Sequence, residues 1–321
     1  MESIFITKSG TLKREQNTIV FRSKDLPTPR YFPVKEVEDI YIMGSVSFNT
    51  ALISFLLEEG IPIHTFHREK YLGSFLPVKS KTSSQVYIKQ FEHFYNYGKR
   101  LYIAKEITLS SAKNLLALLK RYKDAIPQDT IANIQRHISS IEEEKSIEYM
   151  RSHEGIIHRI YMSALSEIFR GYGIIFDGRV KYPPGDIINS MLSYGYAILY
   201  GKVLTYIWQS NLDPRISFVH EPTFKSYALQ LDIADIFKAP IVDSTVLTLA
   251  SRRQIREEMA YIQEGGTYLN KEGKMLLISS LTEKFSTIYQ SQKWKHIIKA
   301  EVKKLEKHVL GEKTYKGFVY R

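Results

Sequence analysis

The chain has 321 residues, of which 44% are hydrophobic and 25% are charged. These fractions lie near the averages of folded soluble proteins, which excludes an intrinsically disordered chain and a fibre. The sequence contains no cysteine, so disulfides, thiol catalysis and cysteine-ligated metals are excluded. Its net charge of +11 favours a polyanionic partner such as nucleic acid. The alternative is a basic protein without such a partner.

Residues 1–82 predict a small β-rich domain. Short segments such as SIFITKSG and GIPIHTFHREKYLGSFLPV alternate apolar and polar residues and are rich in β-branched and aromatic side chains, as strands are. One helix, FNTALISFLLEEG, interrupts them and ends at Gly60. We expect a β-sandwich-like unit that contains this helix. The opening MESIFITKSG lacks the basic and long apolar regions of a signal peptide, and we expect a cytoplasmic protein.

Residues 86–321 predict a larger all-α domain. The polar stretch VKSKTSSQ (78–85) is the predicted boundary, because the period of the apolar residues changes across it from about two to about 3.6. Helical spacing follows at about 85–123, 130–170, 186–208, 225–238, 244–262, 271–289 and 294–310. The most apolar run, 191–208, includes Lys202 and four tyrosines, so we interpret it as a buried core helix and not as a membrane span. The predicted fold class is α+β.

The first candidate for chemistry is a glutamate within a predicted helix. Glycine-rich phosphate loops and serine-centred hydrolase elbows are absent from the sequence, which leaves carboxylates and imidazoles. Glu154 precedes Gly155 in a helical pattern. A glycine inside a helix costs roughly 1 kcal/mol relative to alanine, so Gly155 indicates the close approach of another backbone or of a ligand. His158 lies on the same helix face as Glu154. An ordinary solvated glutamate is the alternative.

A second acidic group lies in FVHEPTFKSYALQLDIADIF, residues 218–237. Asp232 and Asp235 are three residues apart on a predicted apolar helix and therefore share a face. Burying unpaired carboxylates costs several kcal/mol. Lys225 and Lys238 could neutralise them, which is a purely structural solution. A divalent cation would do so better, because Mg²⁺ and Mn²⁺ take oxygen ligands and Mn²⁺ also accepts imidazole nitrogen, which His220 could supply.

The order of these motifs resembles the CRISPR-associated adaptation integrase, the universal nuclease of spacer acquisition. The shared motifs are HEG with Glu154, RVKYPPGDIINSMLSYGYAILY (179–200) and HEPTFKSYALQLDIADIFKAPIVD (220–243), and the resemblance covers essentially the whole chain. It implies that Glu154, His220 and Asp235 are the catalytic metal ligands of a Mg²⁺ or Mn²⁺ site. Asp232 matches a further acidic position one turn earlier and is an additional candidate ligand.

The chain departs from the family pattern at two places. Family members usually carry small residues after the Glu-Gly pair, where this chain has Ile157, His158 and Arg159. Relatives often have a basic residue before the Pro-Pro pair, where this chain has Tyr182. The roles of His158 and Tyr182 therefore stay open. Asn189, after this turn, is interpreted first as a capping residue.

The resemblance also implies an activity and its partners. The expected activity is that of a metal-dependent DNA endonuclease and integrase, which inserts DNA fragments into a repeat array by attack of a 3′-hydroxyl. The expected partners are double-stranded or branched DNA, or DNA with single-stranded ends, a second copy of the chain bound through the β-rich domain, and a small ferredoxin-like adaptation subunit. No membrane is expected. A non-catalytic nucleic-acid-binding scaffold and a metal-dependent RNase are the alternatives.

Basic side chains provide candidate DNA contacts, because the arginine fork matches phosphate geometry. The candidates are Arg179, Lys181, Arg252, Arg253 and Arg256, the last three on the helix predicted at 244–262. Residues 293–321 contain nine Lys/Arg and three Glu, with apolar residues at helical spacing. This pattern predicts an amphipathic helix with a basic outer face, which is either a phosphate-binding surface or a solvated lysine face.

Overall fold

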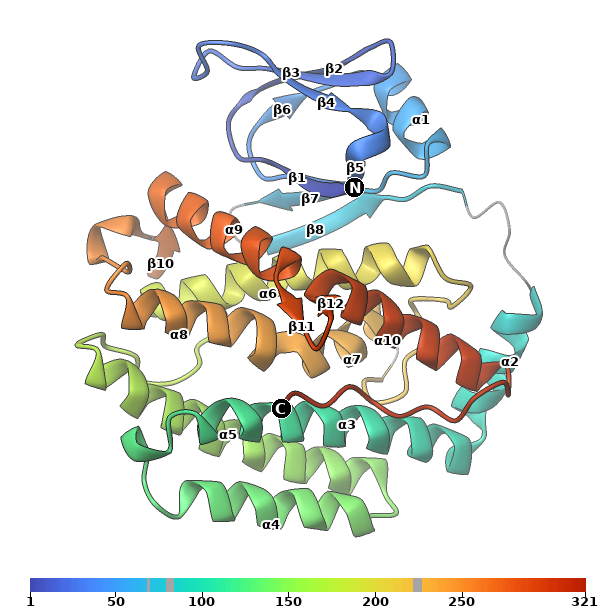
Figure 1. The fold of residues 1–321 in the computed structure, drawn as a ribbon, viewed down its shortest axis with the longest axis vertical. Coiled ribbons are helices and arrows are strands. Elements are labelled where there is room, and N and C mark those ends of the chain that lie inside the picture. The colour runs from blue at the N-terminus through green and yellow to red at the C-terminus, as the bar shows by residue number, and fades with distance from the viewer. Residues whose placement is uncertain (68–69, 79–83, 222–226) are drawn as a thin grey trace.

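The N-terminal region of the chain folds into two four-stranded sheets with one helix beside them (Figure 1). The structure is a computed structural model, and it describes residues 1–67, 70–78, 84–221 and 227–321. One sheet has the order β1 (Glu2–Ile6), β5 (Val37–Ile42), β7 (Ile63–His67) and β8 (Lys70–Phe75). The other has the order β4 (Arg30–Pro33), β3 (Thr18–Arg22), β2 (Gly10–Glu15) and β6 (Val46–Ser47). A 3-10 turn, η1 (Val34–Glu36), precedes β5.

Helix α1 (Thr50–Glu58) lies beside these sheets. It begins at Asn49, whose side chain accepts a hydrogen bond from the Leu52 N–H at 3.0 Å. It ends before Gly60, which has the left-handed φ of +75° that favours glycine after a helix. The sheets and α1 bury a common apolar cluster that includes Leu12, Ile40 and Phe55. The predicted β-rich region with one embedded helix is confirmed.

The rest of the chain is largely helical, as predicted. The long helices are α2 (Ser84–Tyr95), α3 (Tyr97–Lys120), α4 (Thr130–Glu143), α5 (Ile147–Gly171), α6 (Ile187–Trp208), α7 (Ala228–Phe237), α8 (Ser244–Ser251), α9 (Lys271–Ser286) and α10 (Trp294–Val309). Short 3-10 turns are η2 (Lys123–Ala125) and η4 (Glu257–Met259). The prediction of an all-α region missed two small hairpins, formed by β9 (Ala260–Gln263) with β10 (Gly266–Leu269) and by β11 (Ile288–Tyr289) with β12 (Gln292–Lys293).

Helix α6 is the central helix of this region and is buried along most of its length. It packs against α7, α10 and strand β8, and so connects the helices to the β-rich region. This confirms the interpretation of 191–208 as a core helix. Among the residues that the structure describes, no helix is long and apolar enough to cross a membrane. The predicted boundary at 78–85 lies mostly outside the described residues, and the division into two domains stays a prediction.

The predicted helix at 244–262 is too long. Helix α8 ends at Ser251, and Arg253 adopts a left-handed φ of +55°. The N–H of Gln254 then bonds to the carbonyl of Leu249 at 2.9 Å, which closes the helix end. The predicted DNA contacts Arg252, Arg253 and Arg256 therefore lie beyond the helix.

The predicted basic helix near the C-terminus is confirmed as α10. Its apolar positions, Trp294, Ile298, Val302, Leu305 and Val309, are buried. Exposed lysines, including Lys303 and Lys307, lie on the outer side of the helix. A DNA-binding role for this outer face stays a prediction.

Candidate active-site cleft

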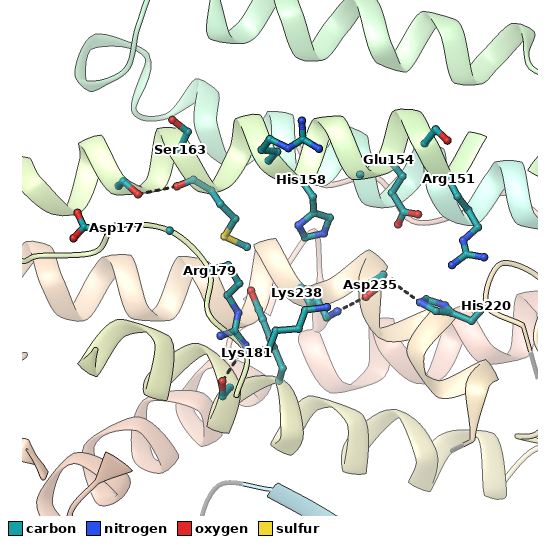
Figure 2. A pocket seen from close by; sticks show the side chains of 18 of the residues that line it. Arg151, Glu154, His158, Ser163, Asp177, Arg179, Lys181, His220, Asp235 and Lys238 are labelled. Atoms are coloured by element: carbon teal, nitrogen blue, oxygen red, sulfur yellow. Dashed lines mark hydrogen bonds and ion pairs between the residues drawn. The ribbon is translucent and has the colours of Figure 1, made fainter. Parts of the chain in front are cut away.

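A cleft of about 1190 Å³ lies between α5, the chain segment 177–181 and the helix α7. Helix α5 forms one wall, and side chains from α6 and α7 form the other (Figure 2). The lining residues include Glu154, Gly155, His158, Arg179, Lys181, Tyr196, His220, Asp235 and Lys238. The structure thus brings together the three predicted catalytic ligands, from three separate parts of the sequence.

Glu154 extends from α5 into the cleft (Figure 2). Burial and then the neighbouring carboxylate of Asp235 raise the pKa of Glu154 to about 7. A Cβ placed on the adjacent Gly155 would meet nothing within 4 Å. The expectation that a neighbouring backbone approaches Gly155 is therefore wrong for the described residues. Gly155 instead leaves part of the cleft wall open, and the close approach of a ligand stays a prediction.

His220 is held in place by Asp232. The carboxylate of Asp232 lies 2.7 Å from His220 Nδ1 and also accepts the backbone N–H groups of Phe218, Val219 and His220 at 2.6–3.0 Å. The hydrogen bond to Asp232 raises the pKa of His220. Asp232 is fully buried and is not among the residues that line the cleft. The structure therefore places it behind His220, with the imidazole between it and the cleft.

Asp235 lies where His220 and Lys238 meet (Figure 2). Its Oδ2 is 4.0 Å from His220 Nε2, and its Oδ1 forms an ion pair with Lys238. Burial opposes ionisation of Asp235, but Lys238 and His220 outweigh it and lower the pKa of this carboxyl group. Lys238 thus provides part of the structural neutralisation considered from the sequence. Lys225, the other lysine considered, lies outside the described residues.

A π-helical turn, η3 (Lys238–Asp243), joins α7 directly to α8. Pro240 has no N–H to donate, and its ring would clash with the carbonyl of Ile236 in a regular α-helix. The hydrogen bonds of the helix must therefore change at this point. The side chain of Asn114 donates to the Ile236 carbonyl at 2.7 Å, and Ser111 donates to the Asp235 carbonyl at 3.1 Å. The gap between the helices predicted at 225–238 and 244–262 is therefore a bulge within a continuous helix. Such bulges are frequent at functional sites.

The donor atoms of the cleft fit a hard divalent cation. Two carboxylates and one imidazole are suitable ligands for Mn²⁺, and the carboxylates for Mg²⁺. Asp235 Oδ1 is buried and, despite its ion pair, accepts no hydrogen bond of ordinary geometry from the described residues. Within the described part of the chain, however, no three acidic or histidine side chains already enclose an ion position.

Two residues with open roles lie in or beside the cleft. His158 lines the cleft, and burial, followed by the positive charge of Lys238, lowers its pKa to about 4. Tyr182, which follows the cleft residue Lys181 in the sequence, is 73% exposed.

Asn189 is not the residue that caps α6, because Asp186 does so by accepting the Asn189 N–H at 2.7 Å. Asn189 instead accepts the N–H of Val180 at 2.8 Å and so fixes the segment that carries Lys181.

Some of the predicted DNA contacts line the cleft and others do not. Arg179 and Lys181 line the cleft, and Arg179 also donates to Asn189 and Ser193 at 2.9–3.0 Å. Among the described residues that line the cleft, none is Arg252, Arg253 or Arg256, and Arg256 forms an ion pair with Glu272.

Three arginines of α5 that line the cleft, Arg151, Arg159 and Arg170, were not among the predicted DNA contacts. Arg151 and Arg159 lie four residues before and after Gly155. Residues four apart share a helix face, so this spacing was the available signal. Together with Arg179 and Lys181, these side chains give the wall of the cleft several groups that can bind phosphate.

The chain is similar to known proteins both in sequence and in structure. The family model for CRISPR associated protein Cas1 matches residues 4–283. The CRISPR-associated endonuclease Cas1 of Thermotoga maritima is 35% identical over 322 residues, covering 98% of this chain and 99% of the relative. A solved structure of a Cas1 protein from Thermotoga maritima superposes with a TM-score of 0.90, at 35% identity, over 99% of this chain and 100% of that chain.

Two more distant structures share the fold alone. A casposase bound to its integration product has a TM-score of 0.85 at 22% identity, over 100% of this chain and 95% of that chain. A chain of a Cas6-RT-Cas1–Cas2 complex has a TM-score of 0.86 at 17% identity, over 99% of this chain and 36% of that chain. The family model and the relative from Thermotoga maritima span nearly the whole sequence. The chain therefore belongs to the CRISPR associated protein Cas1 family.

Proposed function

We propose that the chain is a metal-dependent DNA endonuclease and integrase that inserts DNA fragments into a CRISPR repeat array. The convergence of Glu154, His220 and Asp235 in one cleft carries this proposal. It is supported by the name endonuclease given to the relative from Thermotoga maritima and by the shared fold of the casposase. In this reaction the oxygen of a 3′-hydroxyl or of water forms a new bond to the phosphorus of a DNA phosphodiester and gives up its proton. The P–O bond to one DNA strand breaks, and the oxygen of the departing strand takes up a proton.

The residues of the cleft have separate tasks in this proposal. Glu154, His220 and Asp235 hold Mg²⁺ or Mn²⁺, and Asp232 orients His220 through its Nδ1 so that Nε2 is available. Arginines of α5, with Lys181, bind phosphates along the cleft wall. The chemistry that the metal supplies when bound is polarisation of the scissile phosphate and activation of the attacking oxygen.

We propose three partners for the chain: DNA, a small adaptation subunit and a second copy of the chain. DNA fits the arginine-lined cleft and the net charge of +11. We also propose a small ferredoxin-like adaptation subunit as a partner, which the shared fold with a chain of the Cas6-RT-Cas1–Cas2 complex supports. A homodimer formed through the β-rich region is the third proposal, and sedimentation of the purified chain would measure it.

The activity is tested with Glu154→Gln, which removes a ligand charge and keeps the shape of the side chain. Glu143→Gln is the matched control, because Glu143 is exposed on α4. With Mn²⁺ and branched DNA, we expect Glu154→Gln to lose at least about 100-fold in cleavage and strand transfer, whereas the control keeps both. Asp232→Asn should lose about 10- to 100-fold, because it acts through His220. Full activity of Glu154→Gln would overturn the proposal.

Two further readouts separate the alternatives. A metal that binds the native state raises the thermal midpoint as its concentration exceeds the Kd. We expect this shift in the wild type and its loss in Glu154→Gln; no shift in the wild type would favour a non-catalytic scaffold. Side-by-side digestion of DNA and RNA should show cleavage of DNA. Cleavage of RNA alone would favour an RNase.

A further inference from the structure

A second cavity, of about 570 Å³, lies between α2, the beginning of α3 and the end of α10. These three elements meet at one side of the helical region (Figure 1). We call this cavity the α2–α10 pocket. Its lining residues are Lys89, Glu92, His93, Gly98, Lys99, Tyr102, His308, Val309, Leu310, Gly311, Lys313 and Thr314. Among the described residues, it shares no lining residue with the active-site cleft.

The α2–α10 pocket has an excess of positive charge. Three lysines line it, Lys89, Lys99 and Lys313, against the single carboxylate of Glu92. None of the three lysines forms an ion pair with a described residue. Lys89 is fixed by a hydrogen bond from its Nζ to the Leu310 carbonyl at 3.1 Å. Uncompensated cations that surround a concave site raise the local concentration of anions.

Two histidines in the pocket are held in defined orientations. His93 is only 9% exposed, and its Nδ1 donates to the Lys89 carbonyl at 2.8 Å, because a carbonyl can only accept. His308 Nδ1 accepts the Tyr315 N–H at 3.2 Å, so its Nε2 carries the proton of the neutral ring. Among the described residues, His93 Nε2 has no hydrogen-bond partner, whereas the His308 ring also forms a hydrogen bond with the backbone of Lys313. His93 therefore becomes a donor into the pocket when it takes up a proton.

Ring packing keeps these groups in place. The His93 and His308 rings contact each other edge to face, with centroids 5.4 Å apart. Tyr102 stacks on His308 with centroids 5.3 Å apart. Burial, followed for His308 by the charge of His93, lowers the pKa of both imidazoles. The neighbouring lysines make a metal cation between the two rings unfavourable and an anion favourable.

The beginning of α3 faces the same pocket through Gly98 and Lys99. This helix has 24 residues, and its N-cap Asn96 accepts the Lys99 N–H at 3.0 Å. The positive end of a long helix favours a negative charge in front of it. The beginning of α3 therefore adds to the lysines in favouring an anion, against the negative end of α10 at the same pocket.

We propose that the α2–α10 pocket binds a phosphate group, carried either by a nucleic-acid strand or by a free phosphate ion. Lysine ammonium groups and imidazole N–H groups are donors, and the oxygens of a phosphate are acceptors, so that charge-assisted hydrogen bonds form. The inference rests on the pocket alone and does not depend on the activity proposed for the cleft.

The proposal is tested with a double variant, Lys99→Gln and Lys313→Gln, both of which change exposed side chains. The matched control is Lys303→Gln with Lys307→Gln, which removes the same charge from exposed positions of α10 outside the pocket. The probes are inorganic phosphate and a short oligothymidylate. Binding is followed by the NMR resonances of the His93 and His308 rings, assigned with His308→Gln. Thermal unfolding of both double variants checks that they fold.

We expect phosphate, the oligothymidylate or both to shift the two histidine resonances in the wild type and the control. The double variant should bind at least about tenfold more weakly. A response to phosphate alone identifies a free phosphate site, and a response to the oligothymidylate identifies a contact with a nucleic-acid strand. Equal affinity of the double variant and the control for both probes would overturn the proposal. So would an absence of any shift at His93 and His308.

Discussion

Two clusters of charged side chains in this protein contain the same kinds of residue but differ in how completely they are paired. Each has one lysine, two carboxylates and one histidine. The interface cluster, between the β-rich region and α6, consists of Lys202, Glu38, Asp39 and His64. The cleft cluster consists of Lys238, Asp235, Glu154 and His220. Comparing them shows what distinguishes a structural charge cluster from a candidate catalytic one.

The interface cluster is closed and fully paired. Lys202 Nζ bonds to Glu38 at 2.7 Å, to Ser3 at 2.8 Å and to Asp39 at 3.3 Å. Thr205 donates to Asp39 at 2.9 Å. Burial would raise the pKa of Asp39, but the charge of Lys202 outweighs it, and the pKa is lowered. Every charge in this cluster has a partner, and these contacts connect the β-rich region to α6.

The cleft cluster is incomplete. The pKa of Glu154 is raised to about 7 by burial and by Asp235, and the positive charges of His220 and Lys238 offset this shift only in part. Asp235 Oδ1 lacks a hydrogen bond of ordinary geometry from the described residues. A buried carboxylate that is poorly paired and open to a cleft is a candidate for binding or catalysis. Completeness of pairing, and not residue type, separates the two clusters.

The largest effect is expected from removing the central cation of each cluster. Lys202→Met leaves two carboxylates in the interior, and breaking such a pair costs about 3–5 kcal/mol of unfolding free energy. Lys238→Met should cost less, about 1–2 kcal/mol, because Asp235 borders the cleft and can be hydrated. The side chains of Lys202 and Lys238 are 2% and 17% exposed. Denaturant unfolding measures both, with Lys303→Met as an exposed control.

Equal losses in Lys202→Met and Lys238→Met would contradict the distinction between a closed and an open cluster. A change of similar size in Lys303→Met would show that net charge, and not pairing, controls stability.

The second effect is a pH dependence that comes from His64. Its Nε2 must donate to Thr205 Oγ1 at 2.9 Å, because the Thr205 proton goes to Asp39. Burial lowers the pKa of His64 from 6.5 to about 4. As the pH falls, His64 therefore becomes protonated at a higher pH in the unfolded chain than in the folded chain. The unfolding free energy should decrease between about pH 6.5 and pH 4, by up to about 3 kcal/mol, with no further loss from this group below that range.

The measurement is the unfolding free energy as a function of pH for the wild type, His64→Gln and His67→Gln, the last at an exposed position of β7. His64→Gln should lose this contribution to the slope, and His67→Gln should keep it. Parallel curves for the wild type and His64→Gln would rule out His64 as the source.

The composition of the cleft could be predicted from the sequence better than its geometry. The resemblance to the family implied Glu154, His220 and Asp235, and the structure places all three in one cleft. The two aspartates were expected to share a helix face. At about 100° per residue, however, positions three apart differ by about 60°. This difference is enough to direct Asp232 to the backbone of residues 218–220 and Asp235 to the cleft.

Other features depend on partners that are distant in the sequence. The bulge at Pro240 requires Asn114, whose side chain bonds to the Ile236 carbonyl. Lys202 lies in an apolar run, and its partners Glu38 and Asp39 come from the β-rich region. No local pattern predicts such contacts. The end of α8 was missed for another reason, because Arg253 takes a left-handed conformation without the glycine that usually signals it.

The smallest expected effect comes from two glycines within helices, one near each cluster. A Cβ at Gly201 of α6 would lie 2.8 Å from Tyr41 Cε1 and 3.5 Å from His64 Cγ, whereas a Cβ at Gly155 of α5 would meet nothing within 4 Å. Gly201→Ala should therefore destabilise the protein by about 1–3 kcal/mol through overpacking. Gly155→Ala should stabilise it by about 0.5–1 kcal/mol, because alanine favours the helix.

Denaturant unfolding measures the change in unfolding free energy for Gly201→Ala and Gly155→Ala. A DNA cleavage assay of Gly155→Ala measures the effect on activity. If a ligand approaches α5 at Gly155, the added methyl group narrows the cleft, and cleavage should fall although the protein is more stable. Opposite signs for the two substitutions support a closed interface cluster and an open cleft. Because the chemical change is the same, a loss of stability in Gly155→Ala or a neutral Gly201→Ala would mean that the surroundings of these clusters are not as different as the structure indicates.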